Sequence, residues 1–216
     1  MDLFQLPKET VHGKVIPKNA FDKFTNSKQK KLLSTYIKRI TWTHKLSTET
    51  TNLPSKEINE IQLFLIELKI KDDLENILSM INRSIPYHII SILSFEKEIK
   101  ISTIAKHNHP SKPNQSVLDC EFSTDWFELG NKNMEITLRE SLEETFITFC
   151  SQITGRKYSK SDYPTFIAKE INIMEVKIRI KRLKSKIKSV KQFNQKVELN
   201  MELNEMLSTL KELVDN

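Results

Sequence analysis

Residues 58–70 read INEIQLFLIELKI and form the most apolar stretch of the chain. Beyond Gln62 the odd and the even positions are both largely apolar, so neither face of a strand formed here is suited to solvent. A strand that is apolar on both faces is typical of the centre of a sheet with packed layers on either side. We therefore expect this stretch to be the central strand of the fold.

Strand and helix signals alternate around this stretch. Asp72 and Asp73 are good capping residues for a helix that Pro86 ends, and a second helix is predicted at 138–149. Further strands are predicted at 39–46, 87–95, 99–105 and 117–127. This order predicts an α+β fold, in which helices pack on a mixed or antiparallel sheet, in a globular domain of residues 1–160.

The last quarter of the chain carries a heptad repeat in which one member, Asn194, is polar. The repeat consists of Ile173, Val176, Ile180, Leu183, Ile187, Val190, Asn194, Val197 and Met201. No Pro or Gly follows Pro164, so we expect one helix from about residue 168 to about residue 214, roughly 70 Å long. A seam of this length needs a partner in water, so residues 161–216 are predicted to be a coiled-coil segment that forms a homodimer.

The charge on the predicted helix is divided along its length. No acid lies between Glu175 and Glu198, and the basic residues there include Lys177, Arg179, Lys181, Arg182, Lys184, Lys186, Lys188 and Lys191. Such a run suits sequence-independent binding to the phosphates of DNA, although a solvated coiled-coil face gives the same pattern. Because like charges would meet in a parallel dimer, we favour antiparallel pairing, which brings the basic half beside the acidic end. Asn194 is an argument for the opposite arrangement, because it resembles the polar residue that sets the register of parallel dimers.

Composition excludes several classes of protein. The net charge of +6 over 216 residues favours a polyanionic partner, although a basic balance is also common in Lys-rich bacterial proteins. The three glycines fit no Gly-rich phosphate loop or dinucleotide fingerprint, so we expect no nucleotide cofactor. Cys120 and Cys150 are predicted to be reduced thiols, and without a signal peptide or membrane-spanning run we expect a soluble cytoplasmic protein.

One candidate catalytic motif stands at the end of the central strand. Glu67-Leu68-Lys69 matches the second half of a restriction-type nuclease signature, in which the carboxylate helps to bind Mg²⁺ and the lysine positions the water. The upstream acid would be Glu60 or Glu49, neither of which is convincingly placed. The alternative is a strand that turns polar as it leaves the core, and we favour a protein without catalysis of its own.

The histidines give weaker signals than the nuclease motif. His107 and His109 have metal-ligand spacing, but their Pro-rich surroundings are typical of a surface loop. His44 and His88 stand singly on predicted strands, where structural histidines are common. We therefore expect no metal site, with Mg²⁺ needed only if the nuclease hypothesis holds.

Several motifs together carry a likeness to a known family. They are Ile16-Pro17-Lys18 with Phe21, the segments 40–46, 60–69 and 85–87, and KQFNQKVELN at 191–200. On these motifs the chain resembles a bacterial family known only as a domain of unknown function. Its members look like companions of restriction-type helicases and DNA methyltransferases in defence or modification gene clusters. The resemblance implies work on or near DNA, and a helicase or DNA methyltransferase as partner.

The sequence thus predicts a non-catalytic accessory subunit of a bacterial restriction-modification or anti-phage defence assembly. It would dimerise through its C-terminal helix and associate with DNA or act as a scaffold. The alternatives are a Mg²⁺-dependent nuclease that uses Glu67 and Lys69, and an adaptor that binds only protein.

Overall fold

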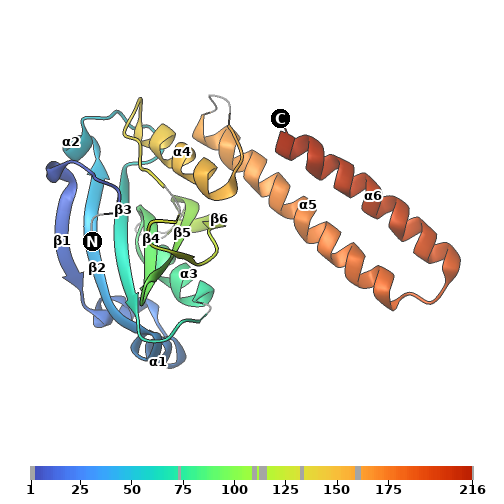
Figure 1. The fold of residues 1–216 in the computed structure, drawn as a ribbon, viewed down its shortest axis with the longest axis horizontal. Coiled ribbons are helices and arrows are strands. Elements are labelled where there is room, and N and C mark those ends of the chain that lie inside the picture. The colour runs from blue at the N-terminus through green and yellow to red at the C-terminus, as the bar shows by residue number, and fades with distance from the viewer. Residues whose placement is uncertain are drawn as a thin grey trace. The chain divides into compact units, whose positions relative to one another are not determined.

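A computed structural model describes residues 3–72, 74–108, 111, 116–131, 134–158 and 162–215. The chain divides into two compact units, Met1–Tyr158 and Ser159–Asn216 (Figure 1). We call the first the sheet unit and the second the helical hairpin. The α+β fold class is confirmed, because the sheet unit holds a mixed sheet with helices packed on it, and two long helices follow.

The sheet has the strand order β1-β2-β3-β4-β5-β6, and the short β7 also pairs with β5. β3 and β4 run parallel, and the other neighbours run antiparallel. The strands are β1 (Val11–Ile16), β2 (Ile37–Ser47), β3 (Glu60–Leu68), β4 (His88–Phe95), β5 (Glu98–Asn108), β6 (Ser116–Ser123) and β7 (Phe127–Glu128).

β3 is buried along nearly its whole length, as its two-sided apolar pattern predicts. Ile61, Leu63, Phe64 and Ile66 have no exposed surface. A parallel neighbour requires a crossover connection, and α3 (Glu75–Ser84) supplies it between β3 and β4. The central position of β3 follows from these two facts.

Different elements cover the two faces of β3. Phe64 and Ile66 join a core with residues of α1 (Ser27–Tyr36), α3 and the 3₁₀ helix η2 (Lys18–Phe24). On the other face a small cavity beside Leu63 is lined by Phe4, whose ring meets that of Phe149 edge-on at 5.7 Å. Phe149 belongs to α4 (Leu142–Thr154), so the N-terminal segment and α4 meet. The short helices η1 (Lys8–Thr10) and α2 (Thr48–Thr51) complete the sheet unit.

Some predicted boundaries differ from the structure. Leu74, not an aspartate, is the N-cap residue of α3 and makes no side-chain capping bond, while Asp73 lies outside the described residues. α4 begins at Leu142 because Ser141 caps it by accepting the N–H of Glu144. The segment predicted as one strand at 117–127 is divided between β6 and β7.

The prediction of one continuous C-terminal helix is wrong. α5 (Tyr163–Ser189) and α6 (Phe193–Asp215) are separate helices that pack against each other, and 190–192 connect them. Val190 is extended at the end of α5, and the Ser189 hydroxyl donates to the carbonyl of Lys186. Lys186 and Lys188 also favour a helix end here, since cations interact well with the carbonyl end of a helix.

A carboxylate of α4 fixes the start of β3. Glu143 Oε1 accepts the backbone N–H groups of Lys56, Glu57 and Ile58, at 2.7, 2.8 and 2.9 Å. Burial alone would raise the pKa of this carboxyl, but the N–H donors outweigh burial and hold the pKa below its ordinary value. Glu143 therefore ties α4 to the segment that enters the central strand.

We expect Glu143→Ala to lower the free energy of unfolding by about 3 kcal/mol, because it leaves three N–H groups without their acceptor. Urea denaturation followed by circular dichroism measures this loss. Glu57→Ala is the matched control, because the Glu57 side chain is exposed and its change should be nearly neutral. Equal stability of the two variants would contradict a structural role for the Glu143 carboxylate.

Candidate functional site

A cluster of polar side chains lies on one face of β2 and β3, at the edge of the apolar core. The register pairs Lys45 with Gln62 and Ser47 with Glu60, so these four residues share a face. The pairing also sets Trp42 opposite Phe64, which belongs to the core on that face. The cluster therefore continues the core face toward the start of β3.

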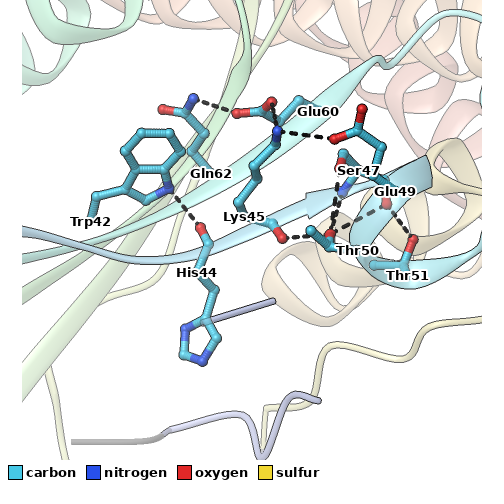
Figure 2. Close-up of polar contacts among 9 residues, drawn as sticks. All are labelled: Trp42, His44, Lys45, Ser47, Glu49, Thr50, Thr51, Glu60 and Gln62. Carbon is cyan, nitrogen blue, oxygen red and sulfur yellow. Dashed lines mark hydrogen bonds and ion pairs between the residues drawn. The ribbon is translucent and has the colours of Figure 1, made fainter. Parts of the chain in front are cut away.

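Glu60 is the centre of this cluster (Figure 2). Its Oε1 accepts an N–H from the Gln62 amide at 2.6 Å, and its Oε2 lies 3.4 Å from Lys45 Nζ. The same ammonium lies 3.7 Å from Oε2 of Glu49. The Glu60 side chain is 9% exposed and that of Glu49 84% exposed, so Lys45 links a buried carboxylate to a solvated one.

The turn that follows β2 places Glu49 over Lys45. Thr50 Oγ1 donates to the carbonyl of Lys45 at 2.7 Å, and Thr51 Oγ1 donates to that of Ser47 at 2.8 Å (Figure 2). The N–H of Ser47 in turn donates to Thr50 Oγ1 at 3.0 Å. These bonds form α2, a single turn of helix at 48–51, and fix where Glu49 stands.

An imidazole and an indole stack beside the cluster. The rings of His12 and Trp42 lie 3.7 Å apart between centroids, and Trp42 Nε1 donates to the carbonyl of His44 at 2.8 Å. Burial lowers the pKa of His12, the cations of Lys14 and Lys45 lower it further, and Glu60 opposes them. The neutral form of His12 is therefore favoured, and its buried Nε2 has no hydrogen-bond partner among the described residues.

The chemistry available to this cluster is limited by Lys45. Its ammonium lies between Glu49 and Glu60, where it neutralises the charge that a divalent cation would otherwise meet. No group of three or more His, Cys, Asp or Glu side chains that suits a metal ion occurs in the described part of the chain. The cluster is best understood as a satisfied polar network that holds β2, β3 and α2 together.

Of the three residues of the nuclease hypothesis, Glu60 is not brought together with Glu67 and Lys69. Glu67 stands near the far end of β3 from Glu60, and the alternation of the strand places the two on opposite faces. Arg39 Nε pairs with Glu67 Oε2 at 2.5 Å. Lys69 Nζ donates to the carbonyl of Ser34 at the end of α1, at 2.8 Å. Each of the three charged groups therefore has a structural partner of its own.

The histidines have differing surroundings. His107 Nδ1 lies 2.9 Å from Asp119 Oδ1 and is on an exposed side chain, while His109 lies outside the described residues. His44 is buried, and the ring of His88 meets that of Phe146 of α4 at 4.8 Å. Burial lowers the pKa of His88 to about 3, Lys106 lowers it further, and Glu143 opposes them.

Lys106 is a buried lysine that no motif or pattern in the sequence singles out. Its Nζ donates to the carbonyls of Asn82 and Ile85, at 2.8 and 2.7 Å, where α3 ends. Burial lowers its pKa to about 7. The side chain thus satisfies carbonyls that the end of a helix leaves without partners.

The basic residues of α5 from position 177 onward all project into solvent. They are Lys177, Arg179, Lys181, Arg182, Lys184, Lys186 and Lys188, and Lys191 follows the helix and is also exposed. Arg179 pairs with Glu202 of α6, at 2.5 Å between Nη2 and Oε1. Across the described ranges of the chain, the other seven have no ion pair. Most of this charge therefore remains available to a partner.

The heptad residues do not form one seam. Ile173, Val176, Ile180 and Leu183 are buried, whereas Ile187 and Val190 are half-buried near the end of α5. Beyond the break, Asn194, Val197 and Met201 are exposed, and Leu199 is the buried residue of α6. The heptad register thus ends at 190–192, and α6 presents a different set of residues to its neighbour.

We expect Arg39→Ala, Glu67→Ala and the double variant to lose the same small stability, about 0.5 kcal/mol, because a partly exposed pair contributes little and is lost once. Urea denaturation measures this coupling. The nuclease hypothesis makes a different prediction, that Glu67→Ala abolishes Mg²⁺-dependent cleavage of plasmid DNA. If the unchanged chain cleaves DNA and the Glu67→Ala variant does not, the Arg39–Glu67 pair is not purely structural.

We expect acid to destabilise the protein through His88. Its pKa is about 3 in the folded protein and 6.5 for an ordinary histidine, so below pH 6.5 only the unfolded chain gains the proton. The free energy of unfolding should fall by about 2 kcal/mol between about pH 7 and pH 5 from this group. His88→Leu should remove that part of the slope. Parallel pH profiles for the two proteins would contradict this assignment.

Comparison with known proteins adds one finding to this geometry. No curated protein and no solved structure matches the chain. None of the described helices is both long enough and apolar enough to cross a membrane. A family model, the domain of unknown function DUF4391, matches residues 4–210. Because this match covers nearly the whole of both units, the chain belongs to the DUF4391 family.

Proposed function

We propose that this protein is a non-catalytic accessory subunit that associates with DNA in a bacterial restriction, modification or anti-phage defence assembly. The observation that carries the proposal is the exposed basic surface of the helical hairpin. Seven cations between Lys177 and Lys191 have no ion pair within the described residues. Charges that are exposed and unpaired in this number favour a polyanionic partner.

The spacing of these charges suits a phosphate backbone. The part of α5 from 177 to 189 carries seven basic side chains, and a helical rise of 1.5 Å per residue spreads it over about 20 Å. Duplex DNA carries one phosphate per 3.4 Å of each strand, or about six over that distance. Lysines and arginines at this density act as point charges along the backbone and read no base sequence.

The assembly is proposed on the family resemblance. Residues 193–200, the most distinctive part of that likeness, form the first turns of α6. A helicase or DNA methyltransferase partner would supply the chemistry, and this chain would add contact with DNA. The structural partners of Glu67 and Lys69 support an accessory role over the nuclease alternative.

We also propose that the protein forms a homodimer. Because α6 folds back on α5, the dimer cannot be the coiled coil of two long helices that the heptad repeat predicts. Within one chain α6 already packs on α5, and Arg179 pairs with Glu202 in an antiparallel arrangement. Two chains would keep these contacts if each α6 covered the α5 of the other copy, with 190–192 as the hinge. Light scattering of the full chain tests this, and a monomeric mass at every concentration would remove the dimer from the proposal.

We expect the full chain to bind duplex DNA with an affinity that falls steeply with salt. Lys181, Lys184 and Lys188 lie on one side of α5. Replacing all three by Gln should make the negative slope of log K against log salt shallower by about three, or about one per lysine. Fluorescence anisotropy of a labelled duplex measures both quantities. Gln retains helix propensity, so α5 should persist.

The matched control is the variant Lys8→Gln, Lys97→Gln and Lys157→Gln, which removes the same charge from exposed positions of the sheet unit. Its salt slope should stay close to that of the unchanged chain. Equal losses in the two triple variants would show that net charge, not the α5 surface, binds DNA. No binding even at low salt would favour the adaptor that binds only protein.

A further inference from the structure

An aromatic side chain stands exposed where the helical hairpin turns. Phe193 is the first residue of α6 and is 78% exposed, the largest exposed fraction among the large apolar side chains of the described residues. It directly follows the connection 190–192, so it lies at the end of the hairpin where α5 stops and α6 begins (Figure 1). An exposed ring at such a position is accessible to a partner from several directions.

The surroundings of Phe193 are cationic. No acid occurs between Glu175 and Glu198. Within five residues of Phe193 along the chain lie the exposed lysines Lys188, Lys191 and Lys196 and a single acid, Glu198. The dipoles of α5 and α6 present opposite ends here and offset each other, so the lysines decide the sign of the field. A fitting partner therefore combines a flat apolar face with nearby negative charge. Nucleotides have both, in the base and its phosphate.

We propose that Phe193 stacks on an unpaired base of DNA while Lys191 and Lys196 contact the adjacent phosphates. The inference rests on the proposed function and adds a preference to it. The cations of α5 bind phosphates of any strand, whereas Phe193 needs a base with a free face, which the interior of a duplex does not offer. Such stacking is independent of sequence because every base has a π face.

The sequence argues against stacking only within the basic run itself. Residues 177–191 contain no aromatic residue, so lysines and rings do not alternate there. Phe193 lies just beyond that run, and the break at 190–192 brings it to the end of the hairpin instead of the middle of a long helix. The fold thus adds the ring that the basic run lacks.

Two neighbouring residues separate this proposal from docking on another protein. Val197 and Met201 follow Phe193 at intervals of four, so all three lie on one side of α6, and Met201 is 68% exposed. A protein that docked on this apolar side would contact all three. An unpaired base held between Lys191 and Lys196 would contact Phe193 and not Met201, which lies beyond the acid Glu198.

The test uses the full chain and two labelled probes, a single-stranded oligothymidine and a duplex of the same length. We expect Phe193→Ala to weaken binding of the single strand about tenfold, a typical loss for one stacked base, and to leave duplex binding unchanged. The salt slope should not change, because no charge is removed. Phe193→Trp should retain the affinity, and Met201→Ala, the matched control, should bind as the unchanged chain does.

The outcomes separate this inference from the proposed function. Unchanged binding of the single strand by Phe193→Ala, with the lysine variants still impaired, overturns the stacking and leaves the DNA-associated role. Equal losses for Phe193→Ala and Met201→Ala overturn it in favour of an apolar docking side. Failure of the unchanged chain to bind either probe overturns both proposals. Thermal melting of each variant confirms that it is folded.

Discussion

Because β3 is apolar on both faces, the chain has to cover it twice. The core of α1, α3 and η2 packs on the side of Phe64 and Ile66, and the N-terminal segment lies on the side of Leu63. Glu143 then holds the segment that leads into β3 through three backbone N–H groups. A shift of β3 by one residue would exchange its two faces, so this bond network protects the register of the whole sheet.

The helical hairpin follows from a second apolar surface that requires a cover. The buried side of α5 has a partner in α6 of the same chain, which a three-residue connection brings back at little entropic cost. Association of two chains would also cost translational and rotational freedom. The fold-back also has an electrostatic consequence. Among the described residues it pairs one cation of the basic run, Arg179, with the acid Glu202 of α6. The remaining charge is left to define the surface of α5.

The polar cluster on β2 and β3 shows where reasoning from sequence ends. From the sequence Glu60 is a candidate upstream acid for Glu67, but the alternation and length of β3 separate them. Its actual neighbours, Lys45 and Gln62, depend on the pairing of β2 with β3, which includes a bulge between Trp42 and His44. A bulge changes which residues share a face, and no local pattern in either strand reveals it. His12 and Lys106 were missed for the same reason, since their neighbours are distant in sequence.

The class of the fold, the centre of the sheet and the basic character of the C-terminal segment can all be predicted from the sequence alone. These features depend on local periodicity and composition, which each segment carries alone. Three features depend on contacts between distant segments: the division of the C-terminal segment into two antiparallel helices, the separate structural partners of Glu67 and Lys69, and the position of Phe193 at the end of a hairpin. The physical reason is that an apolar seam must be buried, but the seam does not specify which segment buries it. Here the next stretch of the same chain does so, because closing a short connection costs less entropy than associating two chains.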